Sequence, residues 1–96
     1  MVFEEFHSSL TGDLPPAGIS PLLAALWWDA KGNWEKAHTI AQEVESPDGA
    51  RVHAYLHRKE GDQANAGYWY RHAGMTPSRS PHDTEWEEIV RALLKA

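Results

Sequence analysis

The fold of this chain is decided by two stretches of equal length, ALWWDAKGNWEKA at residues 25–37 and AYLHRKEGDQANA at residues 54–66. Set in register, both begin and end with alanine, and both carry a glycine followed by a short polar residue at the same place. Glycine ends a helix by adopting a left-handed backbone, and asparagine or aspartate can then cap the next helix. Each stretch therefore predicts one helix, a tight turn and a second helix, which together form an antiparallel hairpin.

The sequence on either side extends both hairpins. Ser20-Pro21 and Ser46-Pro47 each place a capping hydroxyl before a proline, which is typical of a helix start. Apolar residues then recur three and four positions apart, whereas strand-like alternation is absent. The first of these helices is apolar almost all round, which predicts a buried helix at the centre of the core. Its apolar residues are Ile19, Leu22, Leu23, Leu26, Trp27 and Trp28.

Two more helices are predicted outside the hairpins. Phe3, Phe6 and Leu10 share one face of a short N-terminal helix, and Ser80-Pro81 begins a longer C-terminal one. We expect both to cover apolar faces that the hairpins leave open. The sequence thus predicts an all-α fold and a single domain over residues 1–96: two tandem antiparallel hairpins with short N-terminal and longer C-terminal capping helices.

The two hairpins resemble the tetratricopeptide-type repeat over about residues 20–74. The resemblance departs from that family in its spacing, which is shorter than the usual 34 residues, and in His57, where the family prefers a large aromatic. The alternative is a non-repetitive bundle with the same helices. The likeness is carried by Ala25, Trp28, Gly32-Asn33, Trp34, Ala37 and Val44 in one copy, and by Ala54, Gly61-Asp62, Ala66, Tyr70 and Ala73 in the other.

The resemblance implies a binding groove lined by the first helix of each hairpin. Residues 49–81 carry five basic side chains against two acidic ones, in a chain whose net charge is −5. Two guanidiniums, an ammonium and a phenol can grip a carboxylate. We therefore expect a non-catalytic module that binds an acidic protein or peptide segment; alternatively, these bases balance acidic residues within the fold or face water. The groove residues would be Leu22, Leu26 and Asp29 in the first copy, and Arg51, Tyr55, Arg58 and Lys59 in the second.

A pair of histidines supports a different function. His53 and His57 stand four residues apart on one predicted helix, so both imidazoles lie on the same face and can bind a metal ion. The third ligand stays open between His38, His72 and Asp29. The alternative function is thus a metal- or small-molecule-binding helical protein; the simpler interpretation is a solvated histidine pair. The sequence alone predicts no cofactor, and His53 and His57 are its candidate metal ligands.

Composition argues against several other classes. The chain has no cysteine, hence no thiolate zinc site, and it lacks a G-x-S-x-G motif or a glycine-rich phosphate loop, which argues against an enzyme. Its negative charge disfavours nucleic acid as a partner. No apolar run reaches the roughly 20 residues of a membrane helix, and no secretory signal is recognisable. We expect a cytoplasmic protein, with a homodimer or a subunit stable only against another chain as further options.

Overall fold

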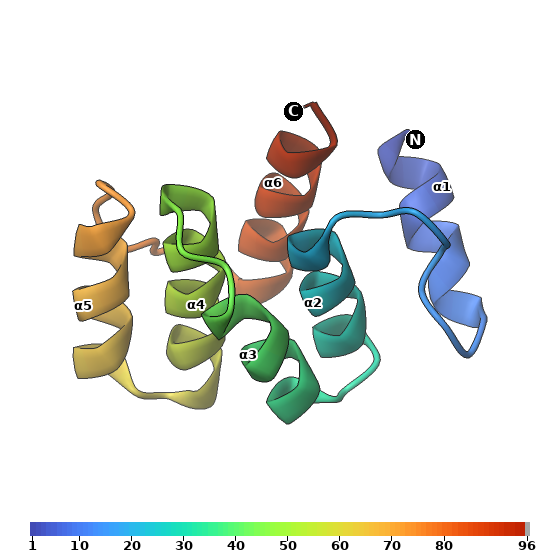
Figure 1. Ribbon diagram of the computed structural model, residues 1–96. Coiled ribbons are helices and arrows are strands. Elements are labelled where there is room, and N and C mark those ends of the chain that lie inside the picture. The colour runs from blue at the N-terminus through green and yellow to red at the C-terminus, as the bar shows by residue number, and fades with distance from the viewer. Residues whose placement is uncertain (96) are drawn as a thin grey trace.

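A computed structural model describes residues 1–95, and over that range the protein is all-helical, without a strand (Figure 1). The two predicted hairpins and both terminal helices are confirmed. None of the helices in this range is long and apolar enough to span a membrane. The elements are α1 (Phe3–Ser8) with a 3₁₀ turn η1 (Ser9–Thr11), the first hairpin α2 (Pro21–Ala30) and α3 (Trp34–Gln42), the second hairpin α4 (Pro47–Glu60) and α5 (Gln63–His72), and α6 (His82–Lys95).

The turns inside the two hairpins have the same construction. Gly32 and Gly61 both adopt the left-handed backbone, with φ of 86° and 93°. The side chains of Asn33 and Asp62 then each accept a 3.1 Å hydrogen bond from the backbone N–H three residues later. The N–H groups of the same two residues each donate a 2.9 Å bond to the carbonyl five residues earlier. The two turns are therefore structurally equivalent, while membership of the tetratricopeptide family stays a prediction.

Replacing Gly32 or Gly61 by valine should lower the free energy of unfolding by about 1–2 kcal/mol each, measured by urea denaturation. A Cβ atom at either position would meet nothing within 4 Å, so the cost comes from backbone strain alone. Gly67→Ala is the matched control, since this helical glycine has no left-handed backbone. If Gly61→Val were tolerated while Gly32→Val was not, the two turns would not be equivalent.

The core is built around α2. Leu26 and Trp27 are fully buried, and the indole N–H of Trp86 in α6 donates a 2.9 Å bond to the backbone carbonyl of Leu26. Small residues allow the helices of each hairpin to approach closely. At most 1 % of the surface of each of the four equivalent alanines is exposed: Ala25, Ala37, Ala54 and Ala66.

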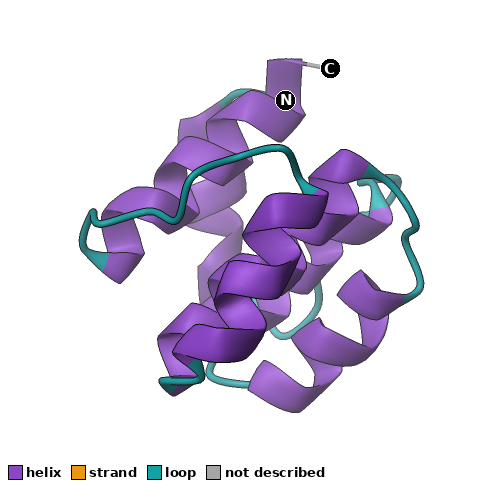
Figure 2. Ribbon diagram, turned by 90° about the vertical axis from the view of Figure 1, so that its left-hand side faces the viewer, coloured by secondary structure: helices purple, strands orange, loops and turns teal. Residues whose placement is uncertain are grey.

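The C-terminal helix α6 packs against α1, α2 and α4. It therefore covers the first helices of both hairpins, the two elements that the repeat resemblance assigned to a groove. Its last turns lie at the same end of the molecule as the start of α1 (Figures 1 and 2). There Arg91 lies over the ring of Phe3, 4.3 Å from its centroid. The expected capping role of both terminal helices is thus seen in the packing.

Candidate metal centre

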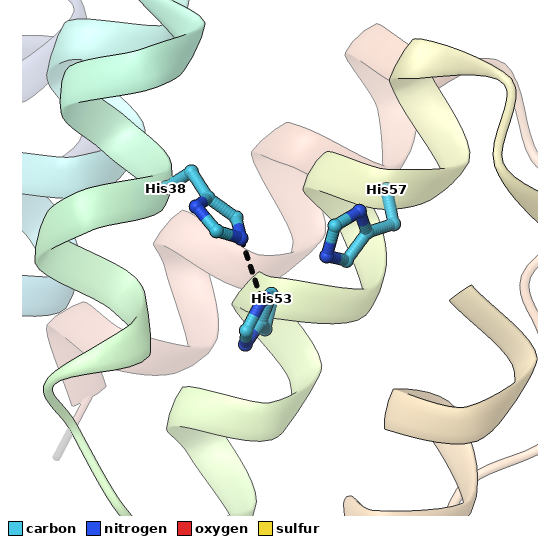
Figure 3. Close-up of side chains that lie close together, drawn as sticks. All are labelled: His38, His53 and His57. Carbon is cyan, nitrogen blue, oxygen red and sulfur yellow. Dashed lines mark hydrogen bonds between the residues drawn. The ribbon is translucent and has the colours of Figure 1, made fainter. Parts of the chain in front are cut away.

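Three histidines converge where the two hairpins meet. His38 extends from α3, and His53 and His57 extend from α4, so that the three rings lie close together (Figure 3). The rings of His53 and His57 stack, and the ring of His38 meets both of them edge to face. One nitrogen of each ring lies within 4.8 Å of the others. Of the three candidates for a third ligand, the structure brings His38 to the pair. His72 and Asp29 do not belong to this group within residues 1–95.

Two tryptophans hold the imidazoles in place. Trp34, one turn before His38 on α3, stacks on that ring with centroids 4.9 Å apart. Its indole N–H donates a 2.8 Å bond to the backbone carbonyl of Leu56, which fixes α3 against α4. On the other side, Trp69 of α5 stacks on His53 with centroids 4.1 Å apart. The cluster therefore lies between two indole rings, and its geometry depends on three helices.

The environment keeps two of the rings neutral. The Nε2 atoms of His53 and His38 face each other at 2.8 Å, so one of them must carry the proton and the other must accept it. Burial, with further contributions from His38 and His57, lowers the pKa of His53 to about 4. Burial and the neighbouring His57 also lower the pKa of His38. Neutral imidazole is the form that binds a metal ion, so both rings are available near neutral pH.

The third ring is oriented by a carboxylate. The Nδ1 atom of His57 lies 2.7 Å from Oε2 of Glu60. In the tautomer that donates its Nδ1–H to this carboxylate oxygen, Nε2 is the nitrogen that can bind a metal ion. A carboxylate behind a ligating histidine fixes the tautomer and raises the basicity of the ligating nitrogen. Glu60 also approaches Asp62, but both carboxylates are exposed and Asp62 caps α5.

The donor set fits a borderline transition metal. In a tetrahedral zinc site with Zn–N distances of about 2.0–2.1 Å, neighbouring nitrogens are about 3.3–3.4 Å apart. The facing nitrogens of His38 and His53, now 2.8 Å apart, would have to separate by about 0.5 Å to reach this spacing. All three ligand nitrogens already lie within 4.8 Å of one another. Imidazole ligands suit zinc, copper and nickel rather than calcium or magnesium.

The residues predicted to line a groove lie mostly inside the protein. Leu26 is fully buried and only 1 % of Tyr55 is exposed. Asp29, 2 % exposed, accepts a 2.9 Å bond from the Tyr55 hydroxyl through Oδ2 and a 3.0 Å bond from Lys59 Nζ through Oδ1. Tyr55 and Lys59 therefore hold a carboxylate, and that carboxylate belongs to this chain. Leu22, also assigned to the groove, is buried as well.

Arg58 likewise forms an ion pair with a buried carboxylate of this chain, that of Glu85 in α6. Its Nη1 donates a 2.8 Å bond to Oε1 of Glu85, which is 2 % exposed, and its other terminal nitrogen donates to the carbonyl of Ser80. The Tyr70 hydroxyl donates a 2.6 Å bond to the second oxygen of Glu85. Arg51 is half-buried, and its Nε has no hydrogen-bond partner among residues 1–95. The C-terminal helix thus occupies the place that the sequence predicted for an acidic partner.

Part of the predicted face remains open. A pocket of about 610 Å³ lies between α1, α2, α4 and α6. Its charged and polar lining includes three of the predicted groove residues, together with two histidines near the ends of α1 and α6. These groove residues are Asp29, Tyr55 and Lys59, the histidines are His7 and His82, and the indole of Trp86 also lines the pocket.

The sequence missed the groups around the cluster. Glu60 follows His57 by three residues and Trp34 precedes His38 by four, which are helical spacings that place each pair on one face. Those spacings were available signals, whereas the stacking of Trp69 on His53 depends on how α5 packs. The chain matches no protein-family model, no curated protein and no solved structure in three comparisons.

Proposed function

We propose that this chain is a metal-binding helical protein whose site is formed by His38, His53 and His57 and takes a divalent transition metal such as zinc. The observation that carries the proposal is the convergence of three imidazole nitrogens within 4.8 Å of one another. The carboxylate of Glu60 behind His57 adds the outer partner that ligating histidines usually have.

A metal ion suits this cluster better than a proton does. Burial and the neighbouring imidazoles disfavour a proton on His53 and on His38, and they lower the pKa of both rings. In addition, a single proton forms a hydrogen bond between only two of the rings, the facing pair His38 and His53. A metal ion would accept one lone pair from each of the three rings at once.

The place of the cluster suggests what the metal does. His38 belongs to the first hairpin, and His53 and His57 belong to the second. A metal ion bound to all three would connect the hairpins at their junction. Because a site of this kind is assembled only in the folded chain, its binding free energy would also stabilise the fold. The proposed role of the metal is therefore structural.

Calorimetric titration of untagged protein with zinc tests the proposal. We expect one zinc ion per chain, and loss of this binding in His53→Ala. Glu60→Ala should weaken zinc affinity by about 10–100-fold, because it removes the carboxylate that orients His57. Glu43→Ala, at another exposed glutamate, is the matched control and should bind like the wild type. Equal affinity in the Glu60 and Glu43 variants would contradict the role of Glu60.

As a second candidate function we propose binding of a carboxylate-bearing protein or peptide segment at the pocket lined by Asp29, Tyr55 and Lys59, as the repeat resemblance implies. The support for it is that 39 % of the Lys59 side chain is exposed beside a pocket of about 610 Å³. Fluorescence polarisation with labelled acidic peptides tests it. Binding should weaken as salt rises and should be lost in Lys59→Ala, while Lys36→Ala should bind normally.

A further inference from the structure

We propose that a metal ion held by His38, His53 and His57 keeps one coordination position that the protein does not fill, and that this position takes a small anion such as a carboxylate. The inference rests on the metal site proposed above and names the ligand of that site. It concerns coordination chemistry rather than the structural role of the metal. The two can therefore be tested separately.

The first support is the number of donors. Within residues 1–95, the group of metal-binding side chains around His38 and His53 contains His57 and no fourth histidine or carboxylate. The carboxylate of Glu60 is bonded to the outer nitrogen of His57, and Glu45 lines the pocket beside His53 without belonging to this group. Zinc prefers four ligands, and in sites with three protein ligands the fourth is water or an exogenous molecule.

The second support is charge. Histidine coordinates a metal ion as a neutral imidazole, so a divalent ion bound to these three side chains would keep both of its positive charges. Glu60 acts on the ion only through the ring of His57. The cluster is also partly buried, with 7 % of the surface of His53 and of His57 exposed. Partial burial strengthens electrostatic attraction, so an anion at the fourth position is favoured over a neutral ligand.

The third support is access. His38 is only half-buried, so the cluster reaches the surface on the side of α3. His53 also lines a pocket of about 420 Å³ between the α3–α4 corner and α5, with Trp69 and His72 in its lining. Trp69, whose indole stacks on His53, forms part of the wall of this pocket. The limited volume of the pocket favours small anions over bulky ones.

The test uses cobalt(II) in place of zinc, because the visible spectrum of cobalt reports its coordination number and ligands. Untagged protein loaded with one cobalt ion is titrated with sodium azide or sodium acetate, at an ionic strength held constant with perchlorate. We expect a spectral shift that saturates at one anion per cobalt ion, and acetate should compete with azide. His53→Ala should lose the protein-bound cobalt spectrum altogether.

A control variant checks whether a side chain fills the fourth position. His72 lines the same pocket as His53 and is the histidine best placed to swing in. His72→Ala should have the wild-type cobalt spectrum and the wild-type response to azide. If its spectrum differs from that of the wild type, and only the variant responds to azide, His72 is the fourth ligand and the proposal is overturned.

The remaining outcomes separate this inference from the proposed function. Cobalt binding with a spectrum insensitive to both anions would overturn the open position and leave the metal site standing. Failure to bind cobalt and zinc would overturn the metal site itself, and the open position with it. A shift that saturates at one anion per cobalt ion supports both.

Discussion

Replacing Glu85 by alanine should lower the free energy of unfolding by about 3–5 kcal/mol, because it removes one partner of a buried ion pair. The side chain of Glu85 is 2 % exposed. Its carboxylate accepts a 2.8 Å hydrogen bond from the guanidinium of Arg58 and a 2.6 Å hydrogen bond from the hydroxyl of Tyr70. Without it, Arg58 would keep its charge at a site where only 13 % of its side chain is exposed. Urea denaturation followed by circular dichroism measures the loss.

Two further variants show whether the pair itself is responsible. Glu87→Ala removes a glutamate from the same helix whose partner, Arg91, is half exposed, so we expect a change within about 0.5 kcal/mol. The double variant Arg58→Met/Glu85→Met should recover much of the loss, since apolar groups of similar volume can replace a buried pair. Comparable small effects for Glu85→Ala and Glu87→Ala would show that the ion pair does not secure α6.

The same contact bears on the predicted groove. If Arg58 lined an open surface, Arg58→Ala would leave the melting temperature unchanged. Because Arg58 instead neutralises the buried Glu85, we expect this substitution to destabilise the protein. Lys59 is paired with the buried carboxylate of Asp29 in the same way, so partner binding in Lys59→Ala has to be compared with the wild type at equal fractions of folded protein.

Zinc should raise the melting temperature by about 10–20 °C at a free concentration one hundred times its dissociation constant. Binding to the folded state alone contributes about 2.7 kcal/mol under that condition. For a domain of this size, each kcal/mol shifts the midpoint by roughly 4–8 °C. Zinc should stabilise the fold because of where its site lies. An ion bound to His38 of the first hairpin and to His53 and His57 of the second would link the two hairpins.

Thermal unfolding with and without zinc measures this shift, and a chelator should reverse it. His53→Ala should show no shift, whereas Glu43→Ala, outside the cluster, should show the full shift. A similar rise in His53→Ala would mean that zinc acts elsewhere on the protein. No rise in the wild type, at a concentration where calorimetry detects binding, would mean that the ion binds the unfolded chain equally well.

Local signals predicted most of the fold. The glycine and the capping residue of each hairpin turn act within a few residues, so Gly32 and Gly61 could be assigned from the sequence alone. The position of α6 could not be assigned in this way. It depends on contacts such as that of Trp86 with the carbonyl of Leu26, sixty residues earlier. As a result, α6 covers part of a face that the sequence left open to a partner, while the pocket beside Lys59 stays open.

The candidate site was predictable to a similar extent. The spacing of His53 and His57 on one helix placed both rings on the same face. Choosing His38 as the third member required knowing which side chains the neighbouring helices bring to that face of α4. There α3 brings His38, whereas α5 brings Trp69. The spacing of three residues between His57 and Glu60 could be read from the sequence. The role of Glu60 as the outer partner of a metal ligand can be recognised only when the positions of the other two rings are known.

The most direct test of the central claim is a crystal grown with zinc and measured on both sides of the zinc absorption edge. We predict one strong anomalous peak per chain, at about 2.0–2.1 Å from Nε2 of His57 and from one nitrogen each of His38 and His53. A chain without a peak between these three rings, or with its principal peak elsewhere, such as beside His7 and His82, would contradict the proposed metal centre.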